Sequence, residues 1–276
     1  MRLALVFNMN RSDTVGVYFE RACRELGWTA ERFGVDRLAH VPRGFDAYVR
    51  IDHGDDYEAA WPDALRPRLF FVSDTHLKHS WRKIRRAAAS YDVMCCAQSW
   101  AASSLPNGAW VPFACDPALH GPRPSAKTLD LAFVGTDGAV PRKFYLQALR
   151  ERYPNSAIGP APHTEMSRLY SSAKIGFNYS IANEVNMRVF EVLASRTCLV
   201  TNLLPPQELS LLGLNDGEHL VMFRHADELI PTIDRLLQDA GARERIAQAG
   251  HDAVVSRHTY AHRLQQIIQQ VQSKTV

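Results

Sequence analysis

Short apolar runs alternate with longer segments of helical period along the first part of the chain. The apolar runs predict strands, and the segments between them predict helices over Val15–Gly27 and Trp81–Ser90. This alternation is typical of βαβ units with a mainly parallel sheet covered on both faces. The predicted strands are Leu3–Asn8, Ala47–Ile51, Leu69–Val72, Val93–Ala97 and Gly108–Phe113.

A break follows, and the pattern then starts again. The stretch Phe113–Pro124 holds three prolines and a glycine, which interrupt regular structure. Beyond it, strands are predicted at Leu129–Val134, Ser156–Ile158, Ile175–Asn178, Cys198–Thr201 and Leu220–Phe223. Helices are predicted at Arg142–Tyr153, Glu165–Ser172, Met187–Ser195, Ala226–Gln238, Ala242–Val255 and Tyr260–Gln272. We therefore expect two α/β domains, 1–117 and 118–260, and a final helix over 261–276 that can pack back on the first domain.

Composition supports a globular protein without disulfides. Of the 276 residues, 46% are apolar and 22% are charged, and the net charge is only +3, so a dedicated nucleic-acid binder is not expected. The five cysteines are scattered without paired spacing, which argues against a disulfide framework or a zinc ribbon. The sequence shows neither a signal peptide nor a membrane span, so we expect a cytoplasmic protein.

The loop after the strand Leu129–Val134 is a candidate phosphate site. Gly135 ends the strand, Gly138 follows in a polar loop, and Arg142 and Lys143 open the next helix. Free N–H groups at a helix N-terminus attract phosphate, and an arginine can bind a diphosphate through two parallel hydrogen bonds. An ordinary βα turn with an exposed basic residue would show the same sequence pattern.

A second candidate lies where the strand Ile175–Asn178 leads into a helix. Asn186 is a plausible N-cap, and Arg188 lies in the first turn, where the helix dipole disfavours a cation. That placement suggests an anionic partner such as a diphosphate. Glu191, three residues on, begins the buried part of the helix and could bind the hydroxyls of a ribose. The alternative is a surface ion pair between Arg188 and Glu191.

Polar residues also follow two strands of the first domain. Asp74 and His76 come after Leu69–Val72, where a histidine could act as a general base or bind a transferred group. Two alternatives are a metal site with His79 and a purely structural histidine. Asp52 and His53 end another strand and could assist catalysis, although a loop rich in turn formers looks similar.

A dense basic run extends from Lys78 to Arg86, interrupted by Trp81. It could contact an anionic acceptor or lipid head groups, and hence a membrane surface peripherally. A solvated helix face is the simpler reading.

Several segments, in order, resemble the GT-B glycosyltransferases, in the branch described as spore-maturation-like or group 1 transferases. The main one is Asn186-Met-Arg188-Val-Phe190-Glu191, followed by an apolar strand ending in Thr201. The other pieces are Pro112–His120, Asp130–Gly135 with Arg142, the helices from Glu218 to Arg263, and Leu69–His76.

This resemblance implies two Rossmann-like domains facing across a cleft. It also implies transfer of a hexosyl or related group from a nucleotide-diphosphate sugar, without metal or other cofactor, in a bacterial cytoplasm. Glu191 would bind the ribose, Arg188 with Arg142 or Lys143 the diphosphate, and His76 the reacting sugar. The acceptor could be a glycan, a lipid-linked compound, a protein or a small molecule.

The sequence departs from many retaining relatives, which carry two glutamates seven residues apart. Here the earlier position is Asn183, and Glu184 is displaced by one. A catalytically silent nucleotide-sugar or polysaccharide binder of the same fold is therefore an alternative. An unrelated two-domain enzyme such as an oxidoreductase is another, although no strict G-x-G-x-x-G is present.

Overall fold

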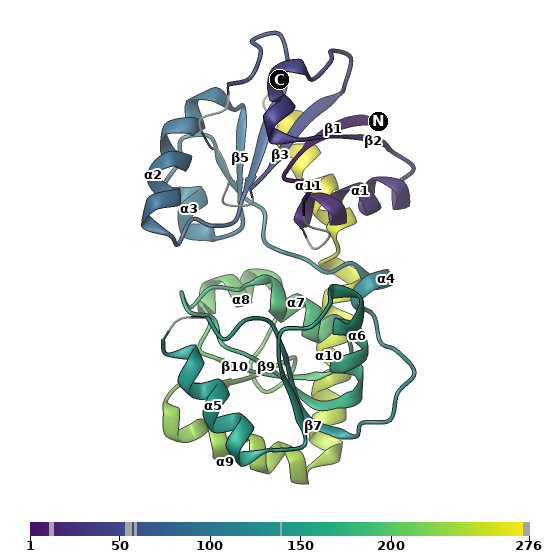
Figure 1. The fold of residues 1–276 in the computed structure, drawn as a ribbon, viewed down its shortest axis with the longest axis vertical. Helices are drawn as coiled ribbons and strands as arrows, with labels where there is room; N and C mark the ends of the chain where they lie inside the picture. Colours follow the sequence, from purple (N-terminus) through teal and green to yellow (C-terminus); the bar gives the residue numbers. More distant parts are fainter. Residues whose placement is uncertain (11–13, 53–56, 58–59, 139, 273–276) are drawn as a thin grey trace. The chain divides into compact units, whose positions relative to one another are not determined.

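The computed structural model describes residues 1–10, 14–52, 57, 60–138 and 140–272 (Figure 1). The chain divides into two compact units: residues 1–112 with 260–276, and residues 113–259. Each unit is built on its own parallel sheet, and each is described by itself below.

The first unit holds a six-stranded parallel sheet in the order β2-β1-β3-β4-β5-β6. Its helices pack on the sheet through side chains such as Phe19 and Ile84, which are fully buried. The strands are β1 (Arg2–Val6), β2 (Thr29–Phe33), β3 (Ala47–Ile51), β4 (Arg68–Val72), β5 (Val93–Cys96) and β6 (Gly108–Trp110). The helices are α1 (Val15–Glu25), α2 (Lys78–Ala87), α3 (Ser99–Ser103) and α11 (Tyr260–Gln272), with short 3-10 turns at Val35–His40 and Ala88–Ser90.

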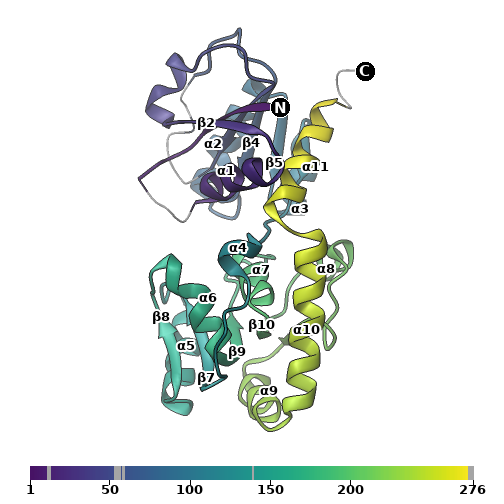
Figure 2. The ribbon, with the colours of Figure 1, turned by 90° about the vertical axis from the view of Figure 1, so that its right-hand side faces the viewer.

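The last helix, α11, belongs to the first unit although the second unit precedes it in the sequence. Tyr260 stacks on Tyr18 of α1, with ring centroids 4.8 Å apart. Figures 1 and 2 both show α11 beside α1. On the same helix, Arg263 donates to the carbonyl of Pro112 at 2.8 Å. This bond ties α11 to the last residue of the segment 1–112.

The second unit holds a five-stranded parallel sheet in the order β11-β10-β9-β7-β8. Apolar side chains of α5 and α9 cover one part of it, where Leu146, Leu149 and Ile233 are fully buried. The strands are β7 (Leu129–Val134), β8 (Ser156–Gly159), β9 (Ala173–Asn178), β10 (Cys198–Asn202) and β11 (Val221–Phe223). The helices are α4 (Pro117–His120), α5 (Arg142–Arg152), α6 (His163–Ser172), α7 (Met187–Ala194), α8 (Pro206–Leu212), α9 (Ala226–Gln238) and α10 (Ala240–Arg257).

Helix α7 is seated by two glycines on neighbouring elements. A Cβ on Gly176 of β9 would lie 2.4 Å from Val192, and one on Gly250 of α10 would lie 2.7 Å from Leu193. The missing side chains let α7 pack closely between the strand and α10. The imidazole Nδ1 of His251 lies 2.8 Å from the Ala194 carbonyl at the end of α7. The C-terminal end of α7 is thus also held by α10.

The structure corrects several element predictions. The strand β2 was not predicted, because this edge strand is only half-buried and lacks an apolar run. The helix expected at Trp81–Ser90 begins earlier, at Lys78, and ends in a 3-10 turn. Short helices α3, α4 and α8 were also missed. In contrast, β7, α9 and α11 have the predicted bounds.

Candidate functional site

The loop after β7 brings two arginines against the main chain. Gly138 has a left-handed φ of +66°, and a Cβ there would lie 2.1 Å from a terminal nitrogen of Arg142. A Cβ on Gly135 would lie 2.5 Å from a terminal nitrogen of Arg188. Any other residue at Gly138 would be strained and would push on the guanidinium. The two glycines predicted for this loop therefore make room for positive charge.

Arg142 and Arg188 converge on the ring of Phe133, the penultimate residue of β7. Their guanidinium carbons lie 5.8 and 4.4 Å from the ring centroid, distances at which a cation is attracted to the ring face. Burial, and then the charge of Arg188, lowers the pKa of Arg142. Among the described residues, no carboxylate forms an ion pair with either arginine. Two cations held together with no paired carboxylate in the described part of the chain favour a negatively charged ligand.

Asp137 supports this loop and is paired with Arg150 rather than with Arg142. Its carboxylate accepts two hydrogen bonds from Arg150, at 2.5 and 3.3 Å, and its backbone carbonyl accepts one from Arg142 Nε at 3.1 Å. The hydrogen bond from Arg150 is the main reason why the pKa of Asp137 is lowered. Lys143, the next predicted phosphate ligand, is exposed at the start of α5.

Asn178 is the centre of the network that holds Arg188. Its Oδ1 accepts from Arg188 at 3.1 Å and from the amide of Asn186 at 3.3 Å, and its own amide donates to Thr201 Oγ1 at 3.0 Å. Arg188 Nε also donates to the carbonyl of Val134 at 3.0 Å. The arginine is thus fixed from both β7 and β9, in an orientation that a flexible surface arginine would not keep.

Asn186 occupies the N-cap of α7, as the sequence predicts, but its side chain caps no helix N–H. Its Oδ1 is buried and accepts no hydrogen bond from the described part of the chain. An orphaned buried acceptor costs free energy, on the order of 1–3 kcal/mol, unless a ligand or water supplies a donor. Asn186 and Arg188 both donate to Asn178 Oδ1, so their side chains lie close together. The N-terminal end of α7 therefore has both an open acceptor and a fixed cation.

Glu191 lies one turn further along α7, and only 8% of it is exposed. The alternative of a surface ion pair between Glu191 and Arg188 is wrong, because the glutamate is buried and the arginine bonds to Val134 and Asn178. The negative charge of Glu191 acts on Tyr170, whose pKa is raised to about 12, mainly by burial. The Tyr170 hydroxyl accepts from the Val134 N–H at 3.1 Å, so Glu191 lies near the end of β7 as well.

The loop between β9 and α7 is anchored by side-chain amides. Asn202 accepts from the Ser180 N–H at 2.7 Å and donates to Asn183 Oδ1 at 3.0 Å. Asn183 has a left-handed φ of +51°, a conformation that asparagine adopts more readily than most residues. The position at which many retaining relatives carry glutamate is therefore occupied here by an asparagine that binds the protein itself.

In the first unit, Asp74 and His76 lie in the turn between β4 and α2. Asp74 is half-buried and His76 is exposed. Asp52 supports this turn, because its Oδ2 accepts the N–H groups of Ser73 and Asp74, each at 3.1 Å, and its Oδ1 accepts the Tyr57 hydroxyl at 2.6 Å. Asp52 thus has a structural task. His53 lies outside the described residues.

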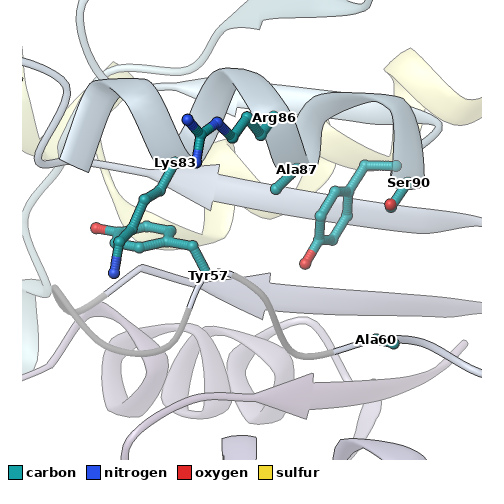
Figure 3. A pocket seen from close by; sticks show the side chains of 7 residues that line it. Tyr57, Ala60, Lys83, Arg86, Ala87 and Ser90 are labelled. Carbon is teal, nitrogen blue, oxygen red and sulfur yellow. The ribbon is translucent and has the colours of Figure 1, made fainter. Parts of the chain in front are cut away.

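No three His, Cys, Asp or Glu side chains of the described residues come together as metal ligands, so Asp74, His76 and His79 do not form the metal site considered as an alternative. A pocket of about 220 Å³ lies in the first unit beside α2. Figure 3 shows Lys83 extending from α2 toward Tyr57, and Arg86, Ala87 and Ser90 on the same side of the pocket. None of the predicted site residues lines it.

Two members of the arginine site were missed by sequence reasoning. The sequence pattern predicted Phe133 as a core residue of a strand and Asn178 as the end of a strand. The signal for Asn178 was a polar side chain closing an apolar run just before a polar loop. Nothing in the sequence distinguishes Phe133 from other buried aromatic residues.

Residues 122–269 match the family model described as glycosyl transferase-like. No match was found among curated proteins. Among solved structures, sucrose-phosphate synthase from Thermosynechococcus elongatus is 12% identical, over 99% of this chain and 100% of that one, with a TM-score of 0.68. HepE from Anabaena, in complex with UDP-glucose, is 11% identical over 99% and 100% of the two chains (TM-score 0.64). TarM from S. aureus, solved with UDP, is 8% identical over 81% of this chain and 55% of TarM (TM-score 0.60). At these identities the likeness establishes the fold, GT-B with two Rossmann-like domains.

Proposed function

Because this chain belongs to the glycosyl transferase-like family, we propose that it moves a hexosyl or related group from a nucleotide-diphosphate sugar to an acceptor. HepE, which shares the fold, binds UDP-glucose, and TarM binds UDP, which supports a donor of this chemical class. In the reaction, a nucleophilic oxygen of the acceptor bonds to the anomeric carbon. The bond from that carbon to the diphosphate oxygen breaks, and the nucleoside diphosphate leaves with the electron pair.

The observation that carries this proposal is the convergence of Arg142 and Arg188 on Phe133 without a carboxylate partner in the described part of the chain. A leaving diphosphate gains negative charge as its bond to the sugar breaks. Fixed donors aimed at that charge lower the barrier, because they need no reorganisation when the charge develops. The glycine loop, the N-terminal turn of α7 and exposed Lys143 add further N–H groups and positive charge.

We assign the remaining site residues by their position relative to this cationic centre. Glu191, buried one turn beyond Arg188, binds the vicinal hydroxyls of the donor ribose. The open Oδ1 of Asn186 accepts a hydrogen bond from a donor hydroxyl. We assign the proton transfer to the turn before α2: His76 takes up the acceptor proton, and Asp74 in the same turn assists it.

We propose that no metal takes part. The two guanidinium groups and the helix N-terminus supply the positive charge that a bound cation supplies in other transferases. A glycan, a lipid-linked compound, a protein or a small molecule would serve as acceptor.

One observation favours the alternative, a silent nucleotide-sugar binder. Asn183 stands where many retaining relatives carry a glutamate, and its amide oxygen is engaged by Asn202.

A turnover assay separates the two functions. The protein is incubated with UDP-, GDP- and dTDP-sugars together with glycan, lipid-linked, protein and small-molecule acceptors, and release of nucleoside diphosphate is measured with and without EDTA. Release that survives EDTA and is lost in Arg188→Gln supports the transferase. Tight binding without release favours the silent binder, and neither binding nor release contradicts both.

A further inference from the structure

The solvent face of α2 in the first unit carries a concentration of positive charge. Five of its residues are exposed and basic or potentially basic: Lys78, His79, Arg82, Arg85 and Arg86. The sequence from Leu77 to Ser90 contains no Asp or Glu, although the whole chain has a net charge of only +3. Helix α2 is held on the sheet by its opposite face, where Ser80 and Ile84 are buried. The positive charge therefore faces outward as one surface.

Large apolar side chains border this charge on one flank. Leu77 is 47% exposed and Trp100 of α3 is 46% exposed. Trp81 lies one turn beyond Leu77 on α2 and packs edge to face on Trp100, with centroids 5.0 Å apart. The guanidinium of Arg85 lies 5.9 Å from the Trp81 ring. Figure 1 shows α2 and α3 together at one side of the first unit.

We propose that this α2 surface, made of Leu77, Lys78, Arg82, Arg85, Arg86 and Trp100, docks on a bilayer rich in anionic lipids. Lysine and arginine are attracted to the negative potential of such a surface, and tryptophan settles at the depth of the head groups. An interfacial helix needs both features, a basic polar face and flanking Trp or Leu side chains. In the described part of the chain, no helix is long and apolar enough to span a bilayer.

The mixture of charge and apolar surface favours a membrane over nucleic acid. A nucleic-acid duplex would be held mainly by phosphate contacts on this face, and exposed Leu77 would gain nothing from duplex or single strand. A bilayer binds both kinds of side chain: basic groups contact the phosphates, and apolar groups are buried just below them. Lys83 and Arg86 also line the pocket beside α2, which gives a head-group phosphate a recess next to this surface.

Sedimentation with vesicles tests this inference independently of the donor chemistry. The full chain is mixed with vesicles of neutral phosphatidylcholine, alone or with about a third phosphatidylglycerol, in low and high salt. Binding is expected only with the anionic vesicles, and it should weaken at high salt, where the Debye length falls from about 10 Å to a few ångströms. Equal binding to both vesicle types, or no binding to either, overturns the proposal.

Matched triple variants locate the surface. Arg82→Gln, Arg85→Gln and Arg86→Gln together should lower the partition coefficient roughly a hundredfold, at about fivefold for each basic residue. The control replaces exposed Arg24, Arg32 and Arg37, elsewhere in the unit, by glutamine. This triple removes the same charge and should lower the partition coefficient severalfold at most. Equal losses in both triples would mean that only net charge matters, and would overturn the α2 surface.

Trp100→Phe separates a bilayer from another polyanion. In the native protein, anionic vesicles should shift the tryptophan emission to shorter wavelength, and the variant should lose most of that shift. Competition by an oligonucleotide at equal phosphate concentration, with no emission shift on vesicles, would identify a nucleic-acid surface and contradict membrane docking. Thermal midpoints of all variants confirm that they are folded.

Discussion

Arg142 and Arg188 come from the first turns of two different helices, yet both guanidinium groups lie on the ring of Phe133, at 5.8 and 4.4 Å from its centroid. The two like charges repel each other, and burial adds to the cost of keeping them charged. The pKa of Arg142 is lowered for these two reasons, burial first. The arrangement is stabilised when an anion enters, which links the fold of the second unit to the chemistry proposed for it.

Arg188→Gln should weaken binding of the nucleoside diphosphate about ten- to a hundredfold. A hydrogen bond to a charged group contributes roughly 1.5–3 kcal/mol, and the glutamine also loses the bonds to Val134 and Asn178. Titration calorimetry measures the change. Arg168→Gln is the control, because that exposed arginine pairs with Glu165 on its own helix, α6, away from Phe133. Equal affinities in both variants would remove Arg188 from the site.

Gly138→Ala should disturb ligand binding through Arg142, beyond its effect on stability. The alanine must adopt a φ of +66°, which costs roughly 1–2 kcal/mol, and its Cβ would lie 2.1 Å from the Arg142 side chain. Gly217→Ala is a matched control with a φ of +77° and nothing within 4 Å. Thermal unfolding should show similar losses for the two variants, whereas only Gly138→Ala should lose nucleotide affinity. Full affinity in Gly138→Ala would show that Arg142 is not used.

His76→Ala should lower turnover without changing donor affinity. A general base contributes about 10²- to 10⁴-fold to a rate, and this histidine is exposed, so its removal leaves the core intact. Steady-state rates and a separate binding titration give the two quantities. A variant with native turnover would exclude the catalytic role.

Asp52→Asn tests the support of the same turn. The carboxylate accepts the Ser73 and Asp74 N–H groups and the Tyr57 hydroxyl, so the loss of its charge should lower the free energy of unfolding by about 1.5–3 kcal/mol. Urea unfolding measures this change. Turnover should fall as well, while nucleotide affinity in the second unit stays the same. A variant as stable as the native protein would contradict this role for Asp52.

Lys127 should make stability depend on pH above neutrality. Burial lowers the pKa of its amine from 10.5 to about 8, and the amine donates to the Arg196 carbonyl and to Thr197. Between these two pKa values the unfolded chain binds more protons than the folded one, so this group makes the native protein more stable as pH rises from 8 to 10.5. Unfolding free energies of the native protein and Lys127→Met, compared across that range, should diverge in favour of the native protein. A constant difference would contradict the shifted pKa.

Sequence periodicity predicted the strands and helices that are buried on a continuous face, such as β7, α9 and α11. It missed β2, whose exposed edge carries polar residues, and α8, which is too short to show a period. Family resemblance and position in a helical turn together singled out Arg188, Arg142 and Glu191. What the sequence could not supply were contacts between distant residues: the seat of both arginines on Phe133, the bonds of Asn178, and the support of the His76 turn by Asp52.

The most direct test of the central claim is a thermal-shift titration of the full chain with UDP, GDP, dTDP, CMP and ADP, with and without EDTA, alongside the double variant Arg142→Gln and Arg188→Gln. A ligand that binds only the folded state raises the unfolding temperature as its concentration grows. The account predicts a shift with one nucleoside diphosphate that EDTA does not reduce and that the double variant loses. No shift with any diphosphate, or an equal shift in the double variant, would contradict a diphosphate site at Arg142 and Arg188.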